Sequence, residues 1–332
     1  MYDGSTTALV TAGELVGVNS EDTVTVSAVA TYNNANVGTG KTITVAYMLS
    51  GKDASKYKAP ATTVMENGVI QAAPLTISTS AVVNNKVYDG TNTATVETQP
   101  VVTGVIDSDV VSIDTTATFA DVSAGGGKTV NLTYTLSGTD ANNYSLASST
   151  TTANITAKQL TVSAPTVSKV YDGTTTATII PGIITGIVES DEVALSATGT
   201  YDDANVGSTK VVSNITYKAV GSKAGNYIAP PASSITNGVI TAAPITAIEN
   251  ITGTATGSQV LTAGASTPTN ATVTYQWQHE NSTEWTNIPG ATSRTYRLQM
   301  SDLGKKVRVQ VTGTGNYSGT ISSAPTVAIT PQ

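Results

Sequence analysis

Strict alternation of apolar and polar residues is the main pattern along the chain. In one stretch the alternate positions are Val24, Val26, Ala28, Ala30 and Tyr32. A period of two marks a half-buried antiparallel strand. Nothing longer than a single turn has helical spacing. The pattern therefore predicts an all-β protein.

The same succession of features occurs three times. The tripeptide Tyr-Asp-Gly begins at Tyr2, Tyr88 and Tyr171, which are 86 and 83 residues apart. Each copy continues with an acidic turn, an alternating strand, a glycine-containing turn and two further strands. Such spacing is the size of a small domain. We predict four domains: three repeats at 1–73, 74–157 and 158–245, and a different domain at 246–332.

Aromatic residues keep their place in all three repeats. The first ring after the tripeptide is Tyr32, Phe119 or Tyr201, and the next is Tyr47, Tyr134 or Tyr217. A phenylalanine replaces tyrosine at one of these positions, so the position needs a ring and not a hydroxyl. We predict that these rings form the cores of small antiparallel β-sandwich-like modules. Single helical turns are expected in "DASKY", "DANNY" and "KAGNY", with Asp53 or Asp140 as cap, and a β-grasp-like module with one short helix is the alternative.

The first repeat lacks an opening strand. "LTISTSAVVNNK" and "LTVSAPTVSK" precede the second and third repeats, but only Met1 precedes Tyr2. Such a strand was either cut away or is supplied by another chain, so the first module should be the weakest. The protein is expected to be a monomer that can associate through this edge. Its abrupt ends indicate a piece of a longer protein.

The last domain carries both tryptophans. Trp277 alternates with Val273 and Tyr275, and a second strand places Val307, Val309 and Val311 on one face. A buried tryptophan facing such a strand is typical of an immunoglobulin-like sandwich, here without a disulfide. Trp277 is predicted to be core. Trp285 and Tyr296 could instead form a surface on which sugars stack.

Composition narrows the chemistry. The chain has 332 residues, a formal charge of −7, no cysteine and one histidine. Thiolate metal sites, iron–sulfur clusters and multi-histidine sites are excluded. The acidic balance argues against nucleic acid, and no apolar stretch is long enough for a membrane span. A catalytic triad could be built only around His279, which we interpret as a solvated loop residue, so we expect no enzyme, no cofactor and no metal.

Other polar groups have two interpretations. Acidic turns could bind calcium, although their spacing is not that of a dedicated loop; they contain Asp22, Asp107, Asp109, Asp191, Glu192, Asp202 and Asp203. Lys86 and Lys169 could form isopeptide crosslinks. The aspartates of the tripeptide, Asp3, Asp89 and Asp172, precede glycine in a turn, where aspartate commonly bonds its own backbone.

The repeats around "KVYDGT", with "ANVG" and "NGVITAAP", resemble bacterial YDG repeat domains over about residues 1–245. The part with "YQWQ", "IPGATS" and "VTGTGNYSG" resembles bacterial immunoglobulin-like domains. Both resemblances imply a stalk in a large extracellular protein of the cell surface or wall, such as an adhesin, with no catalytic residues. The alternative is a binding module whose C-terminal domain recognises a glycan or a host protein.

Overall fold

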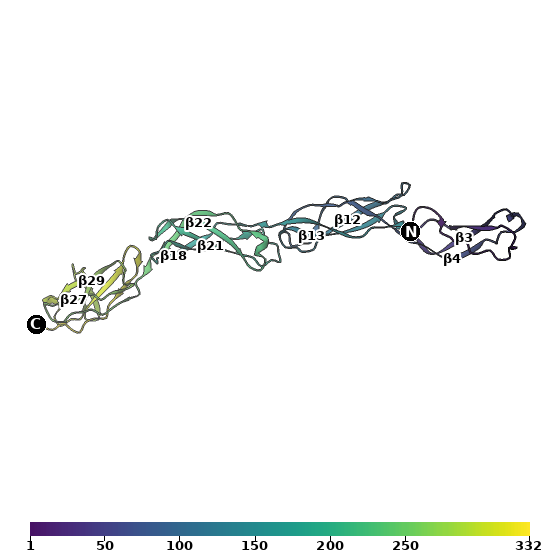
Figure 1. The fold of residues 1–332 in the computed structure, drawn as a ribbon. Helices are drawn as coiled ribbons and strands as arrows, with labels where there is room; N and C mark the ends of the chain where they lie inside the picture. Colours follow the sequence, from purple (N-terminus) through teal and green to yellow (C-terminus); the bar gives the residue numbers. More distant parts are fainter. The chain divides into compact units, whose positions relative to one another are not determined.

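The computed structural model describes residues 1–332 and is all-β, as predicted (Figure 1). Contacts divide the chain into two compact units, Met1–Lys158 and Gln159–Gln332. This boundary lies beside the predicted division between the second and third repeats. The division into four domains stays a prediction, and "module" below means one of those four ranges. None of the helical segments has the length and apolar character that crossing a membrane requires.

The first module is a four-stranded sheet in the order β1-β2-β3-β4. Its strands are β1 (Thr7–Ala8), β2 (Thr25–Tyr32), β3 (Gly38–Ser50) and β4 (Thr63–Ile70). The alternating stretch identified above is β2. Its partner across the hairpin is β3, in a register that places Tyr32 opposite Ile43.

The second module has one more strand, in the order β8-β15-β13-β12-β9. Its strands are β8 (Lys86–Val87), β9 (Thr93–Ala94), β12 (Ser112–Phe119), β13 (Gly125–Ser137) and β15 (Ser149–Thr156). The added strand β8 comes from the segment before the tripeptide. It runs parallel to β15, which departs from the predicted all-antiparallel arrangement.

The third module closes into a barrel in the order β18-β19-β21-β22-β24. Its strands are β18 (Thr166–Val170), β19 (Thr176–Ile180), β21 (Ala194–Tyr201), β22 (Gly207–Val220) and β24 (Ser233–Thr241). The opening strand β18 is antiparallel to β19 and parallel to β24. It thereby closes one sheet on itself, so the predicted β-sandwich-like repeat is a single curled sheet here.

The first aromatic position of the repeat is not equally buried in all copies. Phe119 and Tyr201 are only 2% and 3% exposed, whereas Tyr32 is half-buried. The ammonium group of Lys86 lies over the Phe119 ring, 5.7 Å from its centroid, and that of Lys169 lies over the Tyr201 ring at 5.6 Å. Both lysines belong to opening strands, so Tyr32 lacks this cover. The second ring position is half-buried in every copy, with a hydroxyl near a Thr or Ser; it comprises Tyr47, Tyr134 and Tyr217.

Helical structure in the repeats is limited to three-residue turns at Ala54–Lys56, Ala141–Asn143 and Ala224–Asn226. Asp53 and Asp140 occupy the N-cap positions as predicted, but their side chains make no capping hydrogen bond. Asp53 and Asp140 precede their turns but accept hydrogen bonds from the amides of Thr23 and Val110, at 2.9 and 3.0 Å. They therefore tie the turn to the start of the alternating strand. A turn this short cannot cover a sheet as the helix of a β-grasp-like module would.

The fourth module contains a sheet in the order β30-β29-β32-β34, and β27 pairs with β31 beside it. Its strands are β27 (Val260–Thr262), β29 (Val273–Asn281), β30 (Glu284–Asn287), β31 (Thr295–Arg297), β32 (Val307–Gly313) and β34 (Thr320–Ser322). Trp277 on β29 is fully buried, and its indole N–H donates to the carbonyl of Ser293 at 2.9 Å. The ring of Tyr296 stacks on it at 5.6 Å. These rings anchor the core of the module.

Candidate functional site: the module junctions

Each compact unit contains a junction at which one module packs on the next. In the first unit, the chain leaving β4 forms β5 (Ala73–Pro74), which runs parallel to β14 (Tyr144–Ser145) of the second module. The amide of Leu75 continues the ladder by donating to the carbonyl of Ser145 at 2.8 Å. The segment that links the two modules is therefore paired, as a short strand, with β14.

The second unit repeats this pairing on a different fold. The chain leaving β24 forms β25 (Ala243–Pro244), which runs parallel to β33 (Tyr317–Ser318) of the fourth module. The amide of Ile245 donates to the carbonyl of Ser318 at 2.8 Å. The linker thus docks in the same way on a repeat and on the tryptophan-containing domain.

The tyrosine of the tripeptide is a junction residue. Tyr2 meets Tyr144 edge to face, with centroids 5.4 Å apart and an interplanar angle of 82°. Tyr171 meets Tyr317 in the same way, at 5.5 Å and 79°. This geometry is one that aromatic pairs prefer. The turn predicted for the tripeptide does not include this role; the signal for it is the Asn-Tyr pair that ends "DANNY" and recurs in "GTGNYSG".

An asparagine next to the second tyrosine completes each junction. The side-chain oxygen of Asn143 accepts a hydrogen bond from the amide of Val37 at 2.9 Å, and Asn316 accepts one from Val206 at 2.9 Å. Their amide nitrogens donate to Asn36 and Asn205. The asparagine of one module thus forms hydrogen bonds with the "ANVG" segment of the preceding module.

A carboxylate gives the first junction an electrostatic component. Asp109 accepts hydrogen bonds from the hydroxyls of both Tyr144 and Tyr2, at 2.5 and 2.8 Å. Burial, followed by the hydrogen bond to Asp109, raises the pKa of Tyr2 to about 12. Both causes disfavour the phenolate, so the neutral hydroxyl is held as a donor to the carboxylate.

In each repeat an aspartate of the acidic turn accepts a hydrogen bond from the tyrosine that follows the helical turn. The tyrosine that closes the helical turn donates to an aspartate in the first and third modules too: Tyr57 to Asp22 at 2.7 Å and Tyr227 to Asp191 at 2.6 Å. The structure gathers no group of three or more His, Asp or Glu residues that could hold a metal ion. These aspartates act as hydrogen-bond acceptors, and the absence of calcium stays a prediction.

The first module differs at this end. Lys56 stands where the second module has Asn143, and its ammonium lies 2.8 Å from the carboxylates of both Asp22 and Asp53. Its hydrogen bond, followed by that of Tyr57, lowers the pKa of Asp22. A lysine has no acceptor for the amide of an "ANVG" segment. This end therefore lacks the asparagine contact, one of the three that both junctions share.

The aspartates of the tripeptide organise their own turns. Asp172 accepts from the Lys169 ammonium at 2.7 Å and from the Thr174 amide at 2.9 Å, and its pKa is lowered to about 2, chiefly by the lysine. Asp89 has the equivalent bonds from Lys86 and Thr91. Asp3 accepts from the amide of Ser5. Lys86 and Lys169 thus form ion pairs with half-exposed aspartates, and the isopeptide hypothesis stays untested.

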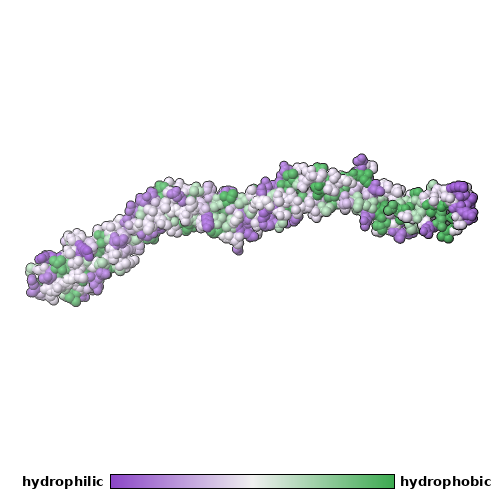
Figure 2. Space-filling model, viewed as in Figure 1, coloured by the Kyte–Doolittle hydropathy of each residue, from purple (hydrophilic) through white to green (hydrophobic).

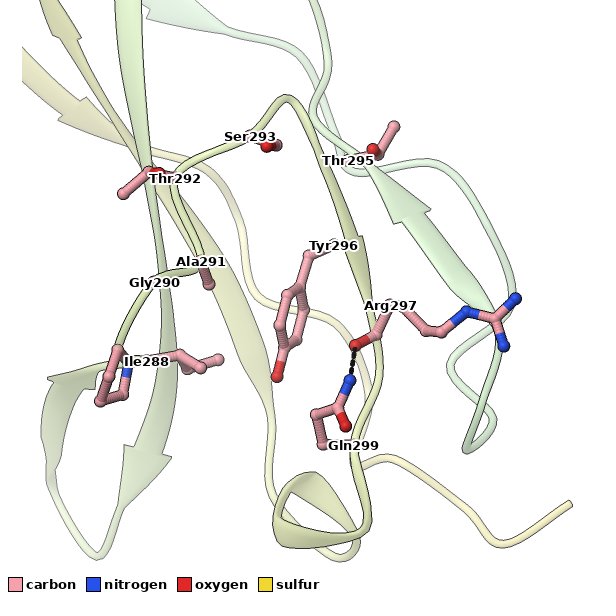
Figure 3. A pocket seen from close by; sticks show the side chains of 10 residues that line it. Ile288, Gly290, Ala291, Thr292, Ser293, Thr295, Tyr296, Arg297 and Gln299 are labelled. Carbon is pink, nitrogen blue, oxygen red and sulfur yellow. Dashed lines mark hydrogen bonds between the residues drawn. The ribbon is translucent and has the colours of Figure 1, made fainter.

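The two rings proposed as a sugar-binding surface differ in exposure. Tyr296 is 8% exposed and donates its hydroxyl to Asp302, so little of its ring is open to a ligand; the sugar-binding surface stays a prediction. Trp285 is half-buried beneath the guanidinium of Arg308, 4.4 Å from its ring centroid. A shallow hollow of about 260 Å³ lies over the segment Ile288–Gln299, where the Arg297 side chain extends away from the Tyr296 ring (Figure 3).

The single histidine is not a solvated loop residue. His279 lies on β29 with its side chain 17% exposed, and its Nδ1 is 3.5 Å from Oδ1 of Asp302. Asp302 is fully buried and also accepts from the amide of Gln299 at 2.8 Å. The strand extends farther than the polar sequence around His279 suggested, which places the histidine against the core carboxylate.

Comparison with known families assigns the repeats. The model of the YDG domain matches residues 1–64, 71–153 and 156–236. No curated protein matches the chain. The matched segments contain both tripeptide tyrosines of the junctions, Tyr2 and Tyr171, together with Tyr144. The residues of the fourth module lie outside the match.

Proposed function

We propose that this chain, which belongs to the YDG domain family, is a non-enzymatic stalk segment of a large bacterial cell-surface protein of the adhesin type. Its role is to project or space a distal binding region outside the cell. The observation that carries the proposal is the junction built twice with the same contacts, on Tyr144 and on Tyr317. A stalk needs modules whose separation stays fixed.

The junction contacts favour a fixed arrangement within each unit. Domains joined by an ordinary linker are expected to move relative to one another. Here the linker is hydrogen-bonded into the next module, a tyrosine pair packs across the junction, and Asn143 or Asn316 accepts a hydrogen bond from the neighbouring loop. Opening the junction would break all three contacts at once.

The fourth module is proposed to be immunoglobulin-like. Support comes from the fully buried Trp277 on β29 and from the alternating, fully buried valines of β32, Val307, Val309 and Val311. In such a domain the two opposed inner faces form the core. Its place in a stalk is supported by Tyr317, which contacts the preceding module as Tyr144 of the second repeat does.

Spin labels test the fixed junction. The chain has no cysteine, so Thr44→Cys and Thr133→Cys on the exposed sides of β3 and β13 place one label in each module of the first unit. A stalk predicts one narrow distance distribution in the full chain. The matched control adds Tyr2→Ala, which should broaden it. A broad distribution before that change would contradict the proposal. Protease accessibility on intact cells tests the surface location.

Ligand binding by the fourth module is a second candidate function. Its support is Trp285, a half-buried ring whose neighbour Arg308 also donates to Gln278 at 2.7 Å. Aromatic and polar groups in this combination suit a glycan or a host protein. A glycan array probed with the full chain and with Trp285→Ala tests it; binding that is lost with the ring would favour this function, and no binding would remove it.

A further inference from the structure

The sheet of the first module has an apolar outward face. Its exposed apolar side chains lie on or directly after the four strands, and we call them the apolar face: Leu9, Val29, Ala46, Met48 and Val64. The ladder places Val29 opposite Ala46, and the core residues Ala30 and Val45 lie on the other side of the sheet. The four larger side chains of the face are each more than half exposed. Figure 2 shows hydrophobic residues gathered over the first module.

The second and third repeats have polar residues at the same positions. By the register of their strands, the counterparts in the second module are all threonines: Thr95, Thr116, Thr133, Thr135 and Thr150. In the third module they are Thr178, Thr198, Thr216, Lys218 and Ser234. All of these residues are exposed. The fold therefore leaves this side of the sheet open in each repeat, and of the three only the first covers it with apolar side chains. An exposed apolar patch of this kind marks an interaction site.

We propose that the apolar face binds the apolar face of a second copy of the chain. In such a pair the two sheets stack about 10 Å apart, as the sheets of a β-sandwich do. A two-fold axis brings the same residues together from both copies. Ala46 is the smallest residue of the face, and Met48 lies beside it on the same side of β3. The flexible Met48 side chain of each copy can therefore fill the space over Ala46 of the other.

The charge of the face favours a second copy over a charged partner. Strands β1 to β4 contain two charged residues. Lys41 is buried, and Glu66 accepts a hydrogen bond from the hydroxyl of Thr42 at 2.9 Å. The chain carries a formal charge of −7, yet two copies can meet here without strong repulsion between like charges. A nucleic acid or a charged peptide finds no complementary group on this face.

The size of the face predicts a weak dimer. The face spans four strands about 4.8 Å apart and extends about 20–25 Å along them, so each copy contributes roughly 400–500 Å². The pair then buries about 800–1,000 Å², which is less than the about 1,200 Å² at which stable interfaces begin. The dimer should therefore form only above micromolar concentration of the chain.

Sedimentation velocity of the full chain tests the proposal. Between about 10 μM and 1 mM the average mass should rise from that of a monomer toward that of a dimer. Val29→Thr with Met48→Thr copies the threonines of the second module. It should weaken the association about tenfold or more, because both copies lose apolar contact. Ile180→Thr with Ile183→Thr is the matched control: it removes exposed apolar side chains of the third module and should leave the association unchanged.

Crosslinking identifies the face. The chain has no cysteine, so Ala46→Cys places one thiol at the centre of each apolar face, and a short bis-maleimide should join two copies. Thr133→Cys, at the counterpart position of the second module, is the control and should give no crosslinked dimer. A chain that stays monomeric at about 1 mM overturns the proposal. Association that survives Val29→Thr with Met48→Thr, or equal crosslinking through both cysteines, also overturns it.

Discussion

The two junctions hold different folds by the same contacts. One joins a repeat to a repeat, and the other joins a repeat to a domain built around Trp277. Both use a parallel linker strand, a tyrosine pair with centroids 5.4 or 5.5 Å apart, and an asparagine that accepts from a valine amide. The docking end is therefore independent of the core behind it.

The junctions differ in what surrounds the tyrosines. Asp109 accepts from both hydroxyls in the first junction. In the second, Tyr171 and Tyr317 pack with Ala271, Val273 and Ile321. The first junction combines ring packing with charge-assisted hydrogen bonds, whereas apolar packing dominates the second. The ring pair and the asparagine are the shared elements, and the carboxylate is an addition.

Removing the ring of Tyr2 should destabilise the first junction more than any other change considered. Tyr2→Ala deletes a buried ring and is expected to raise the free energy of the closed junction by about 3 kcal/mol, as large-to-small changes do. Tyr171→Ala should cost less, because Tyr171 is half-buried. Amide exchange at Val37 and Val206 reports the opening of each junction. Similar, small changes in both variants would refute ring packing as the main contact.

Removing the asparagine should have an intermediate effect, larger at the first junction, where Asn143 is buried, than at the second, where Asn316 is half-buried. Asn143→Ala and Asn316→Ala each leave a valine amide without its acceptor, at a cost of about 1–2 kcal/mol. Asn143→Lys copies the first module, where Lys56 occupies this position, and should cost at least as much. Spin-label distances across the junction measure the result. If the lysine variant kept a narrow distribution, the asparagine would have no part in docking.

Removing only the tyrosine hydroxyl should destabilise the first junction and not the second. Tyr2→Phe loses a hydrogen bond to the Asp109 carboxylate and should destabilise the first junction by about 1 kcal/mol. Tyr171→Phe should leave the second unchanged, because its ring lies among apolar residues. Exchange at Val37 and Val206 again gives the comparison. Equal losses in both would remove the distinction drawn above.

Alkaline pH should act on the first junction through the hydroxyl of Tyr2. The pKa of Tyr2 is raised to about 12 from an ordinary 10.0. The folded value lies above the unfolded one, so this contribution is complete below pH 10 and is lost as pH rises through about 12. The Cζ chemical shift of Tyr2 measures the titration. Asp109→Asn should lower the midpoint only in part, since burial is the larger cause; an unchanged midpoint would contradict the role of Asp109.

Local pattern was enough to predict the strands and the deeply buried rings. The alternation that ends at Tyr201 indicates a strand with one buried face. Phe119 at a position that is otherwise tyrosine indicates that the ring lies in the core. The junctions depend instead on residues far apart in sequence, such as Tyr2 and Tyr144, and no local period connects them. Barrel closure by β18 is likewise a long-range pairing. Tyr32 is half-buried because no lysine lies over its ring. Its counterparts Phe119 and Tyr201 are covered by Lys86 and Lys169.

Amide exchange at Val37 and Val206 in the unmodified full chain tests the common junction most directly. Both amides lie in loops of one module and donate to an asparagine of the next, at 2.9 Å in each case. The account predicts that both are protected, by similar factors of about tenfold or more relative to an open loop. Free exchange at either amide would show that the two folds are not held by the same contacts.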